Sequence, residues 1–308
     1  MSNNSGSSLS IIGALVANIA VAIVKFIAAA FTGSSAMISE GIHSVVDSIN
    51  MVFLLYGHKR SQLPASDKHP FGHGMEIYFW TLVVSISLFA IGGGMAIYEG
   101  ITHIQHPEQL ENPMWNYAVL GAAIVLNGVS WVIAFKEFNK TKKEKSLWRA
   151  IHNSKDPTTF AILFEDTADI LGVIVAFLGV YLGHLYQDPR IDGFASIIIG
   201  VILTVTSIML AYESKGLLIG ESADAPLLDE VLEICKLDTA VDRVRRPLSM
   251  HMGPADILLA LGIHFKDSLT AMEVAEAINR LEHGIKEKFP EVKRIFIEAK
   301  DIASFGKL

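Results

Sequence analysis

The stretch Ser39–Asp47, SEGIHSVVD, places three ionisable side chains inside an apolar run that extends from Ser35 to Leu55. The run is long enough to cross a bilayer, because a membrane helix needs about 20 residues. His43 and Asp47 are four residues apart and share one helix face, and Glu40 falls on the same stripe. Ionisable groups in a membrane helix are costly and usually face a cavity or a partner. The stretch therefore predicts a polar site inside a membrane protein.

A second apolar run, Phe160 to Leu182, carries carboxylates at Glu165 and Asp169, again four residues apart. If the two helices face each other, one imidazole and three carboxylates meet at one point. Such a donor set suits a divalent metal ion. The alternative is that each group only satisfies a helix–helix hydrogen bond, but two such pairs with three acids exceed that need. The candidate ligands are His43, Asp47, Glu165 and Asp169.

Composition is typical of a polytopic membrane protein. The 308 residues are 51% hydrophobic and have a mean hydropathy of +0.41, which is high for a soluble domain of this length. The net charge of -7 argues against a nucleic-acid partner, because nucleic-acid binding needs a basic face. The single Cys235 excludes an intrachain disulfide framework and is interpreted as a core thiol of a helix.

Six apolar runs predict six membrane helices in a lipid bilayer. They cover residues 11–31, 35–55, 77–97, 114–135, 160–182 and 193–211. Residues 1–8 lack the basic region of a signal peptide and are expected to form a disordered arm, so the helical domain is predicted over 9–215. Lys and Arg gather in the loops after the second and fourth runs, which places both termini in the cytoplasm by the positive-inside rule.

Hydropathy falls after Glu213, and residues 216–308 are predicted to form a separate cytosolic domain. Two helices are expected over 227–237 and 268–289, and three strands over 241–249, 257–265 and 293–299. The order helix-strand-strand-helix-strand fits a small α+β (αββαβ) domain of about 90 residues. The predicted fold class is thus a six-helix membrane protein followed by this domain.

These motifs together resemble the cation diffusion facilitator family of proton-coupled transporters of zinc. The likeness rests on TGSSAM at 32–37 leading into EGIHSVVD at 40–47, on HPFGHG at 69–74, on the acidic pair of the fifth run and on the tail. Around 156–158 and 163–166 the chain is most similar to the branch that includes the mitochondrial zinc carrier. The resemblance implies a homodimeric exporter whose metallochaperone-like cytosolic domain lies at the dimer contact.

The resemblance also implies a second metal site at Asp67, His69 and His73, in the loop after the second run. Two histidines and a carboxylate suit zinc but need a fourth ligand. The alternative is a pair of solvated loop histidines with Asp67 forming a turn. The family usually has His or Asp where this chain has Glu165, so the metal preference stays open. Three tail histidines build no metal motif and are interpreted as surface or sheet residues: His251, His264 and His283.

Three further charges are assigned to the support of the ligands or to a proton path: Glu40, Asp166 and Lys25. Lys25 is interpreted as ion-paired or as extending its ammonium toward the outer membrane face. A sharper alternative is that it offsets the surplus negative charge of the site. Asn18, Asn50 and Asn127 are interpreted as interhelical hydrogen-bonding groups.

The hypothesis from sequence is a multi-pass transporter of the inner (cytoplasmic) membrane that exports divalent metal against inward proton flow. Zn²⁺ is the leading cargo, because an imidazole with carboxylates suits a borderline ion, and Mn²⁺, Fe²⁺, Co²⁺ and Cd²⁺ stay open. Metal and H⁺ compete for the same groups, which is the outline of an antiporter. A membrane-embedded zinc enzyme is disfavoured, since no His-Glu-x-x-His motif is present. A metal sensor is also disfavoured, because a sensor needs no charged path across the membrane.

Overall fold

The computed structural model describes residues 4–107, 114–141 and 157–299. The chain divides into two compact units. The first, called the helical unit, comprises Met1–Lys59, Phe79–Ile151 and Pro157–Ser214. The second, called the sheet unit, comprises Arg60–Tyr78, His152–Asp156 and Lys215–Leu308. The loop with HPFGHG therefore belongs to the same compact unit as the tail.

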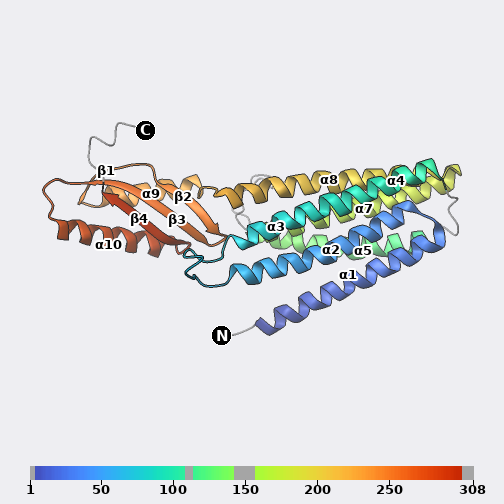
Figure 1. The fold of residues 1–308 in the computed structure, drawn as a ribbon, viewed down its shortest axis with the longest axis horizontal. Coiled ribbons are helices and arrows are strands. Elements are labelled where there is room, and N and C mark those ends of the chain that lie inside the picture. The colour runs from blue at the N-terminus through green and yellow to red at the C-terminus, as the bar shows by residue number, and fades with distance from the viewer. Residues whose placement is uncertain (1–3, 108–113, 142–156, 300–308) are drawn as a thin grey trace. The chain divides into compact units, whose positions relative to one another are not determined.

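The helical unit is a bundle of long apolar helices (Figure 1). The helices are α1 (Asn4–Thr32), α2 (Ser35–Ser61), α3 (Glu76–Ser87), η1 (Leu88–Gly93), α4 (Gly94–Gln105), α5 (Met114–Thr141), α7 (Pro157–Tyr186) and α8 (Arg190–Ile219). Helices α3, η1 and α4 follow one another without a break and form one span with a π-helical turn in its middle.

Four of the six expected spans are confirmed as helices that are long and apolar enough to cross a membrane. They are Ser35–Ser61, Glu76–Gln105, Phe160–Tyr186 and Arg190–Ile219. The described parts of α1 and α5 contain shorter apolar stretches, Asn18–Thr32 and Met114–Val129. The count of six spans therefore stays a prediction.

Helix α1 begins at Asn4, so residues 4–8 are helical and not part of a disordered arm as expected. The stretch is rich in Ser and Asn, which are favoured at helix starts because their side chains can bond free backbone amides. Residues 1–3 lie outside the described residues.

Glycines let α8 approach the η1–α4 segment closely, as membrane helices often do. A Cβ added to Gly93 would lie 2.6 Å from Thr204 Oγ1, and one added to Gly200 would lie 2.9 Å from the Gly93 carbonyl oxygen. The same exclusion recurs at Gly100, where an added Cβ would lie 2.5 Å from the Gly193 carbonyl oxygen. This backbone packing fixes the position of α8 in the bundle.

Asp192 of α8 holds the N-terminus of α2, the helix that carries His43 and Asp47. The hydroxyls of Ser34 and Ser35 donate to its two oxygens at 2.9 and 3.0 Å, and the Ala36 amide donates at 3.1 Å. Asp192 is completely buried, so its charge depends on these donors. A carboxylate at a helix N-terminus is also favoured by the helix dipole.

Asp192→Ala should lower the thermal stability of the purified protein, because two hydroxyls and an amide would lose their acceptor in a buried place. Each buried group left unpaired costs about 1–3 kcal/mol. Asp192→Asn keeps the size and one acceptor oxygen, so it should melt between Asp192→Ala and the wild type. Melting curves in detergent test this, and an unchanged curve for Asp192→Ala would show that the cap does not stabilise α2.

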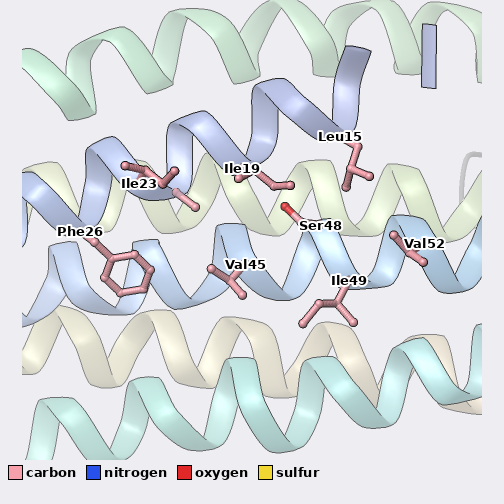
Figure 2. A pocket seen from close by; sticks show the side chains of 9 residues that line it. Leu15, Ile19, Ile23, Phe26, Val45, Ser48, Ile49 and Val52 are labelled. Atoms are coloured by element: carbon pink, nitrogen blue, oxygen red, sulfur yellow. The ribbon is translucent and has the colours of Figure 1, made fainter. Parts of the chain in front are cut away.

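A hollow of about 430 Å³ lies between α1 and α2 (Figure 2). Its lining consists of Leu15, Ile19, Ala22, Ile23, Phe26, Val45, Ser48, Ile49 and Val52. The Ser48 hydroxyl donates to the Ser44 carbonyl of its own helix at 2.9 Å. Since the other lining side chains are apolar, the hollow offers no ligand set for an ion.

The sheet unit contains α9 (Ala225–Leu237), β1 (Val241–Val244), β2 (Leu248–Gly253), β3 (Asp256–Phe265), α10 (Ala271–Lys288) and β4 (Val292–Ala299) (Figure 1). Strands β1 and β2 run antiparallel to β3, and β4 runs parallel to it. Strand β4 pairs with residues 257–263 of β3, which overlap the residues that pair with β1 and β2. Strands β1 and β2 therefore lie end to end along the other edge of β3.

The single strand expected over 241–249 is thus corrected to two strands, and the order becomes helix-strand-strand-strand-helix-strand. The interruption falls at 245–247, where Pro247 lacks the backbone amide that a ladder needs. The Arg245 amide still donates to the Gly262 carbonyl at 2.9 Å, so the chain stays on the same edge of β3.

The two helices of this unit share one hydrophobic core with the sheet. Val231 and Cys235 of α9, Leu281 of α10 and Leu259 of β3 are all buried in it. Burial raises the pKa of the Cys235 thiol to about 11, with the nearby Asp238 adding to the shift. The thiol is therefore a packing group of the core, as the sequence predicted.

Candidate metal site

Three of the four predicted ligands, His43, Asp47 and Asp169, meet between α2 and α7. His43 Nδ1 lies 3.3 Å from Asp47 Oδ1, and His43 Nε2 lies 3.8 Å from Asp169 Oδ1. One ligand atom from each residue lies within 4.8 Å of the others. The i,i+4 spacing turns His43 and Asp47 to one face of α2, so that both reach the same side of α7. One ion could contact all three groups after small side-chain shifts.

The facing atoms of this cluster make no hydrogen bond within the described part of the chain. They are both ring nitrogens of His43, Oδ1 of Asp47 and Oδ1 of Asp169. His43 itself is completely buried. Buried polar atoms are nearly always hydrogen-bonded, so an unbonded group of this composition fits a place where a cation is bound for part of the time.

Glu165, the fourth predicted ligand, is hydrogen-bonded to another residue one helical turn away from the cluster. Its Oε1 accepts a hydrogen bond of 2.8 Å from Asn50 Nδ2. Asn50 lies three residues after Asp47 on α2, and Glu165 lies four before Asp169 on α7, so this contact repeats the α2–α7 contact one turn along. Asn50 is completely buried, and its Oδ1 has no hydrogen-bond partner among the described residues. The pair thus adds a layer of oxygen donors beside the cluster.

Helix α5 contributes Asn127, which donates through Nδ2 to Oδ2 of Asp169. One turn along the same helix, Trp131 Nε1 donates to Thr167 Oγ1 at 3.0 Å. Both bonds fix α7 relative to α5. Together with the bond from Asn50 to Glu165, they confirm the interpretation of Asn50 and Asn127 as interhelical groups, and for Asn18 it stays a prediction. That both amides bond to predicted ligands was missed, because their sequence distance from Glu165 and Asp169 gives no signal of contact.

Lys25 points into the bundle, where it is completely buried. Its Nζ donates to Glu40 Oε2 at 3.0 Å and to Ser44 Oγ at 2.9 Å, and it lies 3.8 Å from Asp169 Oδ1. The ion-paired alternative is confirmed, and the extension toward the outer face is wrong. Carboxylates inside the bundle are close enough to compensate the ammonium, so it need not reach water.

Glu40 is linked to the ligand Asp169 by Lys25, which lies near both carboxylates. Asp166 is not among the residues that form the cluster. A Cβ added to Gly172 of α7 would lie 2.5 Å from Glu40 Oε1. Gly172 therefore leaves room for the Glu40 carboxylate between the helices. Asp166 is partly buried next to Glu165 on α7.

Similarity to known proteins decides the family. Residues 11–219 match the family described as the cation efflux transmembrane domain. The chain belongs to the cation efflux family. This is the cation diffusion facilitator family that the motifs resemble, so that prediction is confirmed. Members of the family are transporters, and the prediction that the chain is not an enzyme is confirmed with it.

Several relatives of this cation efflux protein have descriptive names. The "Proton-coupled zinc antiporter SLC30A9, mitochondrial" of Mus musculus is 28% identical over 89% of this chain and 49% of the mouse protein. The human protein of that name is 29% identical over 78% of this chain and 43% of its own length. The "Manganese efflux system protein MneP" of Bacillus subtilis is 25% identical over 92% of each chain. The chain spans about half the length of the mitochondrial relatives it matches.

The predicted second site of this cation efflux protein lies in the sheet unit. The rings of His69 and His73 have centroids 4.3 Å apart, but Asp67 does not complete a three-ligand cluster with them, since the described residues contain one such cluster, at His43. His73 Nδ1 instead lies 3.4 Å from Glu76 Oε1, which also accepts from Arg60 at 2.8 Å. The i,i+3 spacing of His73 and Glu76 was the sequence signal for this contact.

The tail histidines occupy strands and an exposed helix face. His251 lies on β2 and His264 on β3, both largely buried, and His283 is exposed on α10. His264 Nε2 lies 3.7 Å from Asp267 and 4.0 Å from Asp242. These positions agree with the interpretation as surface or sheet residues.

Proposed function

We propose that this protein exports a divalent metal cation, with Zn²⁺ as the leading cargo, in exchange for protons by alternating access. The observation that carries the proposal is the group of unbonded ligand atoms on His43, Asp47 and Asp169. It lies between two helices of membrane-spanning length in a cation efflux protein. The names of the relatives, a proton-coupled zinc antiporter and a manganese efflux protein, agree with this cargo class.

Zinc is favoured by the chemistry of the three groups. One neutral imidazole and two carboxylates are good zinc donors, and the fourth position would be taken by Glu165 or by water. Asn50 and Glu165 add oxygen donors alone, which suit harder ions. Manganese is therefore the second candidate, supported by this oxygen layer. Fe²⁺, Co²⁺ and Cd²⁺ stay open as cargo of the same mechanism.

We propose proton coupling because the same charged groups can bind either the metal or protons. Metal ligands bind their ion in the deprotonated form, so metal binding and proton binding compete. When the ion leaves, protons can neutralise carboxylates that would otherwise stay charged in a membrane. We propose that Asp166 passes or holds such protons and that Glu40 and Lys25 support the ligands. The resemblance to the family also keeps Asp67, His69 and His73 as a proposed second site for metal.

For location, we propose a multi-pass protein of the cytoplasmic membrane with six spans and both termini in the cytoplasm. The supporting observation is the concentration of Lys and Arg in the loops after the second and fourth spans. We further propose a homodimer that forms through the tail.

Metal flux in liposomes tests the function directly. Purified protein is reconstituted in vesicles with an acidic lumen, and Zn²⁺ entry and lumenal pH are followed together with fluorescent indicators. An antiporter should accumulate Zn²⁺ while the lumen becomes more alkaline, and dissipating the pH gradient should stop the accumulation. A metal sensor or enzyme would move no ion. The absence of flux for both Zn²⁺ and Mn²⁺ would contradict the proposal.

The homodimer should persist when metal is removed, because the tail histidines build no metal motif. The mass of the full-length protein in detergent, measured by light scattering with and without EDTA, should equal two chains in both conditions. Dissociation in EDTA would mean that a bridging metal holds the dimer.

A further inference from the structure

The Lys25 ammonium lies between two carboxylates with different roles. On one side it bonds to Glu40 at 3.0 Å and to Ser44 at 2.9 Å. On the other side it lies 3.8 Å from Oδ1 of Asp169, the same oxygen that lies 3.8 Å from His43 Nε2. A fixed positive charge therefore stands beside an oxygen that the cargo would use.

The charges of the cluster balance around one divalent ion. Lys25 and Glu40 cancel each other, and His43 is a neutral ligand when it binds a metal. Within the three-residue cluster the two remaining charges are those of Asp47 and Asp169, which together match one divalent cation, while Glu165 lies one turn away, bonded to Asn50. Without Glu40, the nearest carboxylate to the ammonium would be Asp169, and the ammonium would compete with the cargo for it.

Glu40 is built to hold the ammonium at this distance. It is completely buried, and it reaches Lys25 from α2 while its other oxygen fills the space left by Gly172 on α7. The Glu40 backbone carbonyl also accepts from Lys25, at 3.5 Å. The hydrogen bonds of the ammonium thus go to Glu40 and Ser44, while the ligand Asp169 lies farther away, at 3.8 Å.

We propose that Lys25 and Glu40 form an internal counter-ion pair that sets how tightly the site holds its cargo, an inference that rests on the proposed function. Lys25 weakens the hold on the metal by placing a positive charge next to Asp169, which favours release. Glu40 holds the ammonium in an ion pair and so prevents it from pairing with Asp169, which leaves Asp169 able to bind the metal. Both act as positioning residues, since neither is a ligand of the ion.

The test measures the Zn²⁺ affinity of the full-length protein in detergent at one fixed pH, by competition with a fluorescent chelator. Lys25→Met should bind Zn²⁺ at least tenfold more tightly, because the repulsion between the positive ammonium and the positive Zn²⁺ ion, which is poorly screened inside the bundle, is lost. Glu40→Gln should bind it at least tenfold more weakly, because the freed ammonium pairs with Asp169. The double variant should return close to the wild type. A purely structural role predicts that both single variants weaken binding, which would overturn the proposal.

A matched Lys–Glu pair serves as the control. Lys236 and Glu233 form an exposed ion pair of 2.7 Å on α9, and Lys236→Met and Glu233→Gln should leave the affinity unchanged. Asp47→Ala separates the two proposals. If Asp47→Ala binds Zn²⁺ like the wild type, the proposed site and function fail. If it loses binding while Lys25→Met and Glu40→Gln shift affinity in the same direction or not at all, this inference alone fails.

Discussion

Asp47→Ala is expected to abolish metal transport while the protein stays folded. Asp47 Oδ1 faces His43 and Asp169 and makes no hydrogen bond in the described part of the chain. Its removal therefore deletes a ligand without breaking a hydrogen bond of that oxygen. Loss of a group that merely orients a ligand costs 10–100-fold in metal affinity or activity, so loss of a ligand should reduce the rate by about 100-fold or more.

Initial rates of Zn²⁺ uptake into vesicles measure this effect, and a melting curve shows whether the variant is folded. Asp229→Ala is a suitable control, because it removes an exposed carboxylate from α9. It should transport like the wild type. Wild-type transport by folded Asp47→Ala would mean that the cation crosses elsewhere in the bundle.

Glu165→His is expected to raise the preference for Zn²⁺ over Mn²⁺. Imidazole suits zinc, whereas a carboxylate suits the harder ion. The variant also removes a negative charge beside the cluster, so fewer protons should be exchanged for each metal. One pH unit of gradient is worth about 1.4 kcal/mol for each coupled proton, so the loss of one proton should visibly weaken uphill transport.

The measurement compares initial rates for both metals, with and without a pH gradient. Glu165→Gln is the matched variant, because it removes the charge but keeps an oxygen that can accept from Asn50. If both variants lose proton coupling but only Glu165→His changes the metal ratio, then Glu165 contacts the ion. An unchanged ratio of Zn²⁺ to Mn²⁺ rates in Glu165→His would mean that Glu165 bonds to Asn50 but does not contact the ion. Asp166 would then become the better candidate for the fourth ligand.

Much of this protein follows from local sequence patterns. Uninterrupted apolar runs identify membrane helices whatever they pack against, since each span must satisfy its own backbone in the bilayer. The i,i+4 spacing placed His43 with Asp47 and Glu165 with Asp169 on shared helix faces. The motifs also indicated the family, which the match over residues 11–219 confirmed. The tail was recognised as a small α+β domain for the same reason, because strands and helices differ in period.

The tertiary structure decided which groups face one another. Periodicity defines a helix face but neither its rotation toward a neighbour nor the residue opposite. The sequence therefore left open whether Lys25 turns inward and did not identify Glu40 as its partner. It also did not indicate that Glu165 binds Asn50 across 115 residues of chain. The capping of α2 by Asp192 spans 158 residues. Such contacts are set by how helices pack against each other, because only then does a buried charge or amide acquire its partner.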